Sequence, residues 1–142
     1  MRNDNFLSTL RLLAVAGPPQ VSRDSAVDIC RAAEAGGVTA LQVRWKVGSA
    51  RDTLELTEQL LEALAIPIYV NDRADVALAA GADGVHLGAE DLHPQRVRVM
   101  APQPFRIGVS VGTEAEAARV REAEVDYWSI GSFYHTDTKR DA

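Results

Sequence analysis

Two aspartates, Asp72 and Asp91, each stand at the end of a short apolar run, and 19 residues separate them. The core of a strand seldom tolerates a carboxylate, so both acids are expected at strand ends. Neighbouring parallel strands lie about 4.8 Å apart, and acids at two adjacent ends could therefore share one divalent cation. Each acid alone is explained as well by a turn or a helix N-cap, but the pair beside phosphate oxygens favours magnesium.

Polar and apolar residues alternate in the segment LQVRWK, residues 41–46. The two-residue period of a strand puts Gln42, Arg44 and Lys46 on one face. In a barrel this face would point inward and toward the ends of the strands. A solvated edge strand is the alternative, but the apolar opposite face and the early place in a parallel series favour a binding site.

Two later segments carry further candidate ligand-binding groups. Ser110 is expected at the end of the apolar run RIGVSV, and Thr136, Thr138 and Lys139 follow the last run. Hydroxyls beside a lysine suit phosphate oxygens, although a solvated loop explains the last three residues equally well. His86 lies inside an apolar run, and a buried, hydrogen-bonded structural histidine is predicted there rather than a ligand.

The combined set contains two acids, three cations and several neutral hydrogen-bond donors, which suits a diphosphate with its metal ion. The sequence holds neither a Walker A loop nor a GxGxxG motif, so a nucleotide-binding fold of the usual kind is not expected.

The candidate site residues follow a repeated strand–helix pattern, which sets the distances between them along the chain. Apolar runs alternate with stretches of helical periodicity, and the runs begin at Leu12, Ala40, Ile66, Gly84, Arg106 and Tyr127. The alternation predicts a parallel sheet with function at the carboxyl ends of its strands. The mean pitch of about 23 residues fits a doubly wound sheet or a TIM barrel, and the pattern alone slightly favours the open sheet because eight barrel repeats would need about 184 residues.

Composition limits the class of protein. The chain has 142 residues and a net charge of −5, which predicts one domain over residues 1–142 and argues against a nucleic-acid partner. No apolar run approaches the ~20 residues of a membrane span. Residues 6–17 slightly resemble a signal peptide, but Arg11 interrupts them, so an initial strand is predicted. Cys30 is the only cysteine, which excludes an intramolecular disulfide and predicts a cytoplasmic protein.

The motifs resemble those of the thiamine-phosphate synthase family of TIM-barrel enzymes. The family pattern Q-x-R-x-K, N-D, H-x-G-Q-E-D, G-V-S and G-x-x-x-x-T-x-T-K matches, in order, residues 42–46, 71–72, 86–91, 108–110 and 131–139. Ala89 stands where the family has glutamine, and Trp45 where it commonly has glutamate. The resemblance implies an α/β fold of the TIM (β/α)8 type with about six βα units present, and it reverses the preference for an open sheet.

The resemblance also implies a transferase of thiamine biosynthesis, which joins hydroxymethylpyrimidine diphosphate to thiazole phosphate and releases diphosphate. It implies that Asp72 and Asp91 hold Mg²⁺, that Gln42 binds the pyrimidine, and that Thr136 and Thr138 lie near the thiazole phosphate. The residues expected on the diphosphate are Arg44, Lys46, Asn71, Ser110 and Lys139, and all of these except Asn71 are also the candidate catalytic residues. A ring nitrogen with a free lone pair needs no general base, which agrees with the lack of an evident catalytic dyad.

Other interpretations stay open. The family continues through two more βα units beyond Ala142, so an incomplete or non-catalytic paralogue that binds a phosphate ligand or a partner protein is the main alternative. A thiazole tautomerase ranks lower, because Gly112 stands where that enzyme uses a histidine. Six strands cannot close a barrel built for eight. If residues 1–142 are the whole protein, the open edges predict a homodimer or a poorly stable chain.

Overall fold

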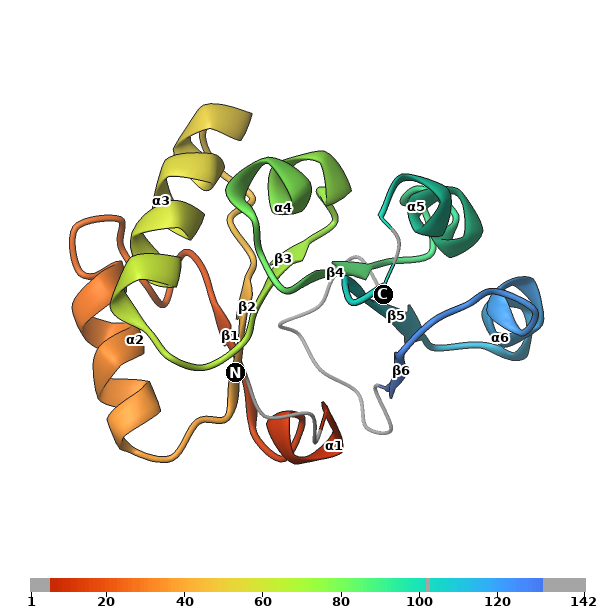
Figure 1. Ribbon diagram of the computed structural model, residues 1–142, viewed down its shortest axis with the longest axis horizontal. Coiled ribbons are helices and arrows are strands. Elements are labelled where there is room, and N and C mark those ends of the chain that lie inside the picture. Colours follow the sequence, from red (N-terminus) through yellow and green to blue (C-terminus); the bar gives the residue numbers. More distant parts are fainter. Residues whose placement is uncertain (1–5, 102, 132–142) are drawn as a thin grey trace.

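The computed structural model describes residues 6–101 and 103–131. Its six strands form one parallel sheet in the order in which they occur along the chain. The strands are β1 (Leu13–Ala16), β2 (Ala40–Val43), β3 (Ile68–Asn71), β4 (Gly84–Leu87), β5 (Arg106–Val111) and β6 (Tyr127–Ile130). The sheet curls into a half-barrel, with β1 and β6 as its two edges (Figure 1). The sequential order confirms the barrel expectation and excludes a doubly wound sheet.

Helices cover the outer side of the half-barrel (Figure 1). They are α2 (Ala26–Ala35), α3 (Ala50–Ala63), α4 (Ala74–Ala80), α5 (Pro94–Met100) and α6 (Glu114–Val120), and a short α1 (Phe6–Thr9) precedes the first strand. Ser49 begins α3 with a reciprocal capping box to Asp52. Gly81 ends α4 in the left-handed conformation, with φ 70°, which glycine adopts without a steric penalty. None of the described helices is long and apolar enough to cross a membrane.

The first strand, which was predicted to begin at Leu12, is confirmed as β1, and the residues before it, Phe6–Thr9, form the short helix α1. This helix makes tertiary contacts at the amino-terminal end of the barrel. The ring of Phe6 lies 6.3 Å from that of Tyr127, and the guanidinium of Arg106 lies 4.4 Å from the Phe6 ring centroid. No local pattern signals such partners, which are about a hundred residues away along the chain.

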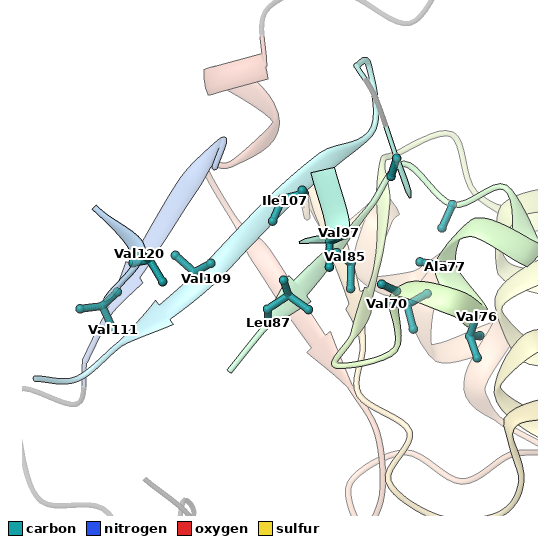
Figure 2. Close-up of a cluster of buried hydrophobic side chains, with 13 residues drawn as sticks. Val70, Val76, Ala77, Val85, Leu87, Val97, Ile107, Val109, Val111 and Val120 are labelled. Carbon is teal, nitrogen blue, oxygen red and sulfur yellow. The ribbon is translucent and has the colours of Figure 1, made fainter. Parts of the chain in front are cut away.

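The pleat gives the half-barrel an apolar outer face and a polar inner face. Residues paired in register lie on the same side of a parallel sheet. The outward positions of β2 to β5 are filled by the buried residues Leu41, Val43, Ile68, Val70, Val85, Leu87, Ile107 and Val109. Figure 2 shows how the side chains from β3, β4 and β5 meet Val76 and Ala77 of α4 and Val97 of α5. A second cluster fills the space between β1 to β3 and the helices α2 and α3.

The side chains of Tyr69 and Tyr127 lie on the inner face of the half-barrel. Gly84 on β4 and Gly108 on β5 leave space for their rings. A Cβ atom at Gly84 would overlap the backbone oxygen of Arg106 and lie 2.9 Å from a ring carbon of Tyr69. One at Gly108 would overlap the ring of Tyr127. The two rings meet edge to face, 5.8 Å apart, a favoured arrangement. The two glycines therefore leave the space on the inner face that both rings occupy.

Candidate functional site

Asp72 immediately follows β3 and adopts a left-handed backbone conformation, with φ 66°. Few residues other than glycine do so, although Asp and Asn tolerate it best. Its N–H donates to the carbonyl of His86 on β4 at 2.8 Å, and the N–H of Arg73 turns back to the carbonyl of Asn71 at 2.8 Å. Two hydrogen bonds thus hold a strained turn at the strand end, which is where functional groups of parallel sheets gather.

Asp91 lies beside Asp72, as predicted from their places after adjacent strands. The N–H of Gly88 donates to the Asp91 carboxylate at 2.6 Å and fixes it at the end of β4. Burial raises the pKa of Asp72, and the charge of Asp91 and a hydrogen bond with it raise that pKa further. Like charges held this close disfavour joint ionisation in the absence of a cation.

The acid pair fits a magnesium ion. Within residues 6–101 and 103–131, no group of three or more His, Cys, Asp or Glu side chains could enclose a metal by itself. Mg²⁺ usually takes one or two carboxylates and completes its shell with phosphate oxygens and water. Two acids at an open strand end are therefore the right donors for a metal that arrives with a phosphate ligand.

Two cations of the β2–α3 connection face the acid pair. Lys46 Nζ lies 3.8 Å from Asp72 Oδ2, and the charges of Lys46 and Arg44 both lower the pKa of Asp72. The strand itself ends at Val43, so the predicted extension of its alternation through Lys46 is wrong. Residues 44–49 instead turn the chain toward the N-cap of α3. The charges of Lys46 and Arg44 nevertheless lie near Asp72, at the carboxyl ends of the strands.

A hollow of about 330 Å³ opens beside these charges, a volume within the range of small-ligand pockets. Its polar lining is contributed by the ends of β2 and β3 and by the start of α3, namely Lys46, Ser49, Thr53, Asn71, Asp72 and Arg73. Lys46, Asn71 and Asp72, three of the predicted site residues, therefore share one cavity. An anion in the hollow would contact Lys46, Arg73 and Asp72. The other described candidates, Gln42, Arg44, Asp91 and Ser110, are not among the residues that line it.

The inner face of the sheet carries the remaining described candidates. Gln42 is buried on β2, which has a strand on each side and is not a solvated edge. Ser110 lies on β5, and its Oγ is 2.9 Å from Nε2 of His86. His86 is buried and hydrogen-bonded, as predicted, and its Nδ1 lies 3.0 Å from the hydroxyl of Tyr127.

The contact between His86 and Ser110 is the relationship that sequence reasoning missed. A signal existed, because the two-residue period places both residues on inward positions of consecutive strands. The register of β4 with β5 pairs His86 with Gly108, two residues before Ser110. Thr136, Thr138 and Lys139, by contrast, lie outside the described residues, and their predicted roles stay predictions.

Comparison with known proteins gives a consistent result. A family model described as thiamine monophosphate synthase matches residues 12–142. Among curated proteins, thiamine-phosphate synthase from Albidiferax ferrireducens is 40% identical over 99% of this chain and 66% of its own length. The protein of the same description from Methanoculleus marisnigri is 44% identical over 81% of this chain and 56% of its own length.

A solved structure agrees with the sequence comparisons. Thiamine phosphate pyrophosphorylase from Pyrococcus furiosus is 34% identical and superposes with a TM-score of 0.80. The match covers 92% of this chain and 65% of that one. The chain thus spans between about half and two thirds of the length of the relatives it matches.

Proposed function

Because the chain belongs to the thiamine monophosphate synthase family, we propose that its carboxyl-end site serves thiamine-phosphate synthesis. In that reaction hydroxymethylpyrimidine diphosphate and thiazole phosphate give thiamine phosphate and diphosphate. The observation that carries the proposal is the Asp72–Asp91 pair with Lys46 and Arg44 close to it. Two acids and two cations close together, beside a hollow that Asp72 and Lys46 line, are what a metal-bound diphosphate requires.

The proposed chemistry breaks one bond and forms another without a proton transfer. The bond between the pyrimidine methylene carbon and the diphosphate oxygen breaks, and its electron pair leaves with the diphosphate. The lone pair of the thiazole ring nitrogen forms the new carbon–nitrogen bond. The protein therefore has to orient two substrates and stabilise the charge that develops on the leaving group.

The acidic residues are assigned to the metal, and the basic and neutral polar residues are assigned to the substrates. We assign the metal to Asp72 and Asp91, where Mg²⁺ would neutralise part of the diphosphate charge. Arg44, Lys46, Asn71 and Ser110 would bind the diphosphate oxygens, and Gln42 on the inner face would bind the pyrimidine. Lys139 would add a third cation, and Thr136 and Thr138 would bind the thiazole phosphate, on the strength of the sequence motif alone.

Calorimetry tests the binding step. Pyrimidine diphosphate titrated into the protein with Mg²⁺ should release or absorb heat with a defined stoichiometry, and the binding should weaken when EDTA removes the metal. Adding thiazole phosphate and measuring thiamine phosphate by chromatography then tests turnover. Binding without turnover would support a non-catalytic paralogue, and the absence of binding at millimolar ligand would overturn the synthase proposal.

We also propose that residues 1–142 form one domain of a cytoplasmic protein, and that these residues by themselves form a homodimer that covers their open edges or are poorly stable. The lone cysteine, Cys30, is buried and cannot bridge within the chain. The edge strands expose apolar side chains, with Val15 54% and Ile130 61% accessible, and unpaired edges favour association. Sedimentation velocity tests this proposal, and a monomer at micromolar concentration would contradict the dimer.

A further inference from the structure

Three polar side chains form a chain of hydrogen bonds on the inner face of the half-barrel. The hydroxyl of Tyr127 on β6 lies 3.0 Å from Nδ1 of His86 on β4, and Nε2 of His86 lies 2.9 Å from Oγ of Ser110 on β5. His86 is 5% accessible. Its two ring nitrogens are thus engaged on opposite sides by two hydroxyls.

The direction of these hydrogen bonds is not arbitrary. A neutral imidazole has one N–H donor and one nitrogen acceptor. Each hydroxyl can donate one hydrogen bond and can also accept hydrogen bonds. In one arrangement Tyr127 donates to Nδ1, and the proton on Nε2 is donated to Ser110. In the other arrangement Ser110 donates to Nε2, and Nδ1 donates to Tyr127. The two arrangements differ in which tautomer His86 adopts and in where the Ser110 proton points.

Two features favour the first arrangement. A phenol is a more acidic donor than an aliphatic hydroxyl, so Tyr127 competes better than Ser110 for the single acceptor nitrogen. Within the described part of the chain, His86 is the polar group that the Tyr127 hydroxyl contacts. The first arrangement therefore uses the phenolic proton, and the second leaves it without a protein acceptor there.

We propose that Tyr127 and His86 are positioning residues that hold the Ser110 hydroxyl as a hydrogen-bond donor to an anionic ligand. With Nε2–H donating to the serine oxygen, the serine proton is free to point toward a diphosphate, which offers only acceptors. The ligand part of this inference rests on the proposed function, whereas the tautomer of His86 does not. A donor oriented before the ligand binds costs little reorganisation when the ligand arrives.

The placement of Tyr127 depends on Gly108. A Cβ at that position would overlap the tyrosine ring, so glycine allows the ring to lie against β5. The ring also packs edge to face against Tyr69 and at a tilt against Phe6. These ring contacts hold the Tyr127 side chain where its hydroxyl lies within hydrogen-bond distance of Nδ1 of His86.

Nitrogen NMR of the histidine rings tests the tautomer directly. The chain has three histidines, and the resonances lost in His86→Gln identify those of His86. At neutral pH we expect a ring protonated at Nε2 and unprotonated at Nδ1. A ring protonated at Nδ1 alone, or at both nitrogens, would overturn the inference whether or not the protein binds a ligand.

Titration with inorganic diphosphate and Mg²⁺ tests the positioning role. Tyr127→Phe should weaken binding by about 3- to 10-fold, the cost of disordering one donor, and should shift the His86 ring toward the other tautomer. Tyr69→Phe is the matched control, because it removes a neighbouring phenol whose hydroxyl hydrogen-bonds Thr9, and it should bind as the wild type does. In a Ser110→Ala background, Tyr127→Phe should have little further effect.

The outcomes separate the two proposals. Wild-type protein that binds no diphosphate but shows the Nε2–H tautomer would overturn the proposed function and leave the hydrogen-bond chain intact. Wild-type protein that binds diphosphate, with Tyr127→Phe binding equally well, would overturn the positioning role and leave the proposed function intact.

Discussion

The ammonium group of Lys46 lies 3.8 Å from the Asp72 carboxylate, although one follows β2 and the other follows β3. Both side chains are partly exposed, so the ion pair by itself contributes little to stability. The ion pair matters because it holds the Lys46 ammonium next to the acid pair at the carboxyl ends of the strands.

Replacing Asp72 by asparagine should abolish magnesium-dependent diphosphate binding without lowering stability in metal-free buffer. Burial and the neighbouring Asp91 raise the pKa of Asp72, so the folded protein disfavours its charged form. A raised pKa stabilises the fold below the unfolded pKa, and this contribution is lost as pH rises through the folded pKa. At pH 7 the amide therefore removes an unfavourable charge. Calorimetry and urea unfolding measure the two effects.

Asp24→Asn provides the control for that variant, because Asp24 is an exposed acid in another loop. It should leave diphosphate binding and the free energy of unfolding unchanged. Full magnesium-dependent binding by Asp72→Asn would remove the shared-cation site from consideration.

Replacing Arg44 by lysine should weaken diphosphate binding by about tenfold, even though the charge is conserved. The planar guanidinium offers two parallel donors to phosphate oxygens, and an ammonium cannot reproduce that geometry. Arg51→Lys, at an exposed position of α3, is the matched control and should bind normally. A dissociation constant for Arg44→Lys equal to that of the control would place Arg44 outside the site.

Asp126 at the amino-terminal end of β6 should contribute strongly to stability and not to ligand binding. Its carboxylate, 7% accessible, accepts from Arg98 at 2.7 Å, from Arg106 at 2.8 Å and from the N–H of Ile107 at 2.7 Å. Asp126→Asn leaves the buried Arg98 without its counter-charge, and such losses cost about 3–5 kcal/mol. Urea unfolding at pH 7 measures the cost, and a change below about 1 kcal/mol would contradict the prediction.

The same carboxylate gives the stability a defined pH dependence. Burial alone raises the pKa of Asp126, but the hydrogen bonds from Ile107, Arg106, Gln103 and Arg98 outweigh it and lower the pKa overall. A lowered pKa stabilises the fold above the unfolded value of about 4, and this contribution is lost as pH falls through the folded pKa. The stability difference between wild type and Asp126→Asn should therefore shrink below about pH 4.

Replacing Gly108 by alanine should destabilise the protein by about 1–3 kcal/mol, because the new methyl group overlaps the ring of Tyr127. The displaced ring should also lose its hydrogen bond to His86, which the ring-nitrogen resonances would report. Gly131→Ala is the control, because a Cβ there meets no atom of residues 6–101 and 103–131 within 4 Å. Equal unfolding free energies for the two variants would show that the tyrosine ring moves aside without cost.

The sequence by itself determined the barrel order and the acid and cation positions. Strand–helix alternation fixes which residues end each strand, and parallel strands bring those ends to one side of the sheet. That geometry is why Asp72, Asp91 and Lys46 could be placed together from spacing. The family motifs turned an open-sheet preference into a barrel, because pitch and length alone did not distinguish the two.

The tertiary structure alone decided the relationships that depend on distant partners. Phe6 packs against Tyr127 and Arg106, and a local sequence pattern cannot predict such contacts. Asp72 combines a positive φ with a hydrogen bond from its N–H to β4. His86 and Ser110 meet because the register of β4 with β5 sets their offset, and register is a property of the assembled sheet rather than of either strand.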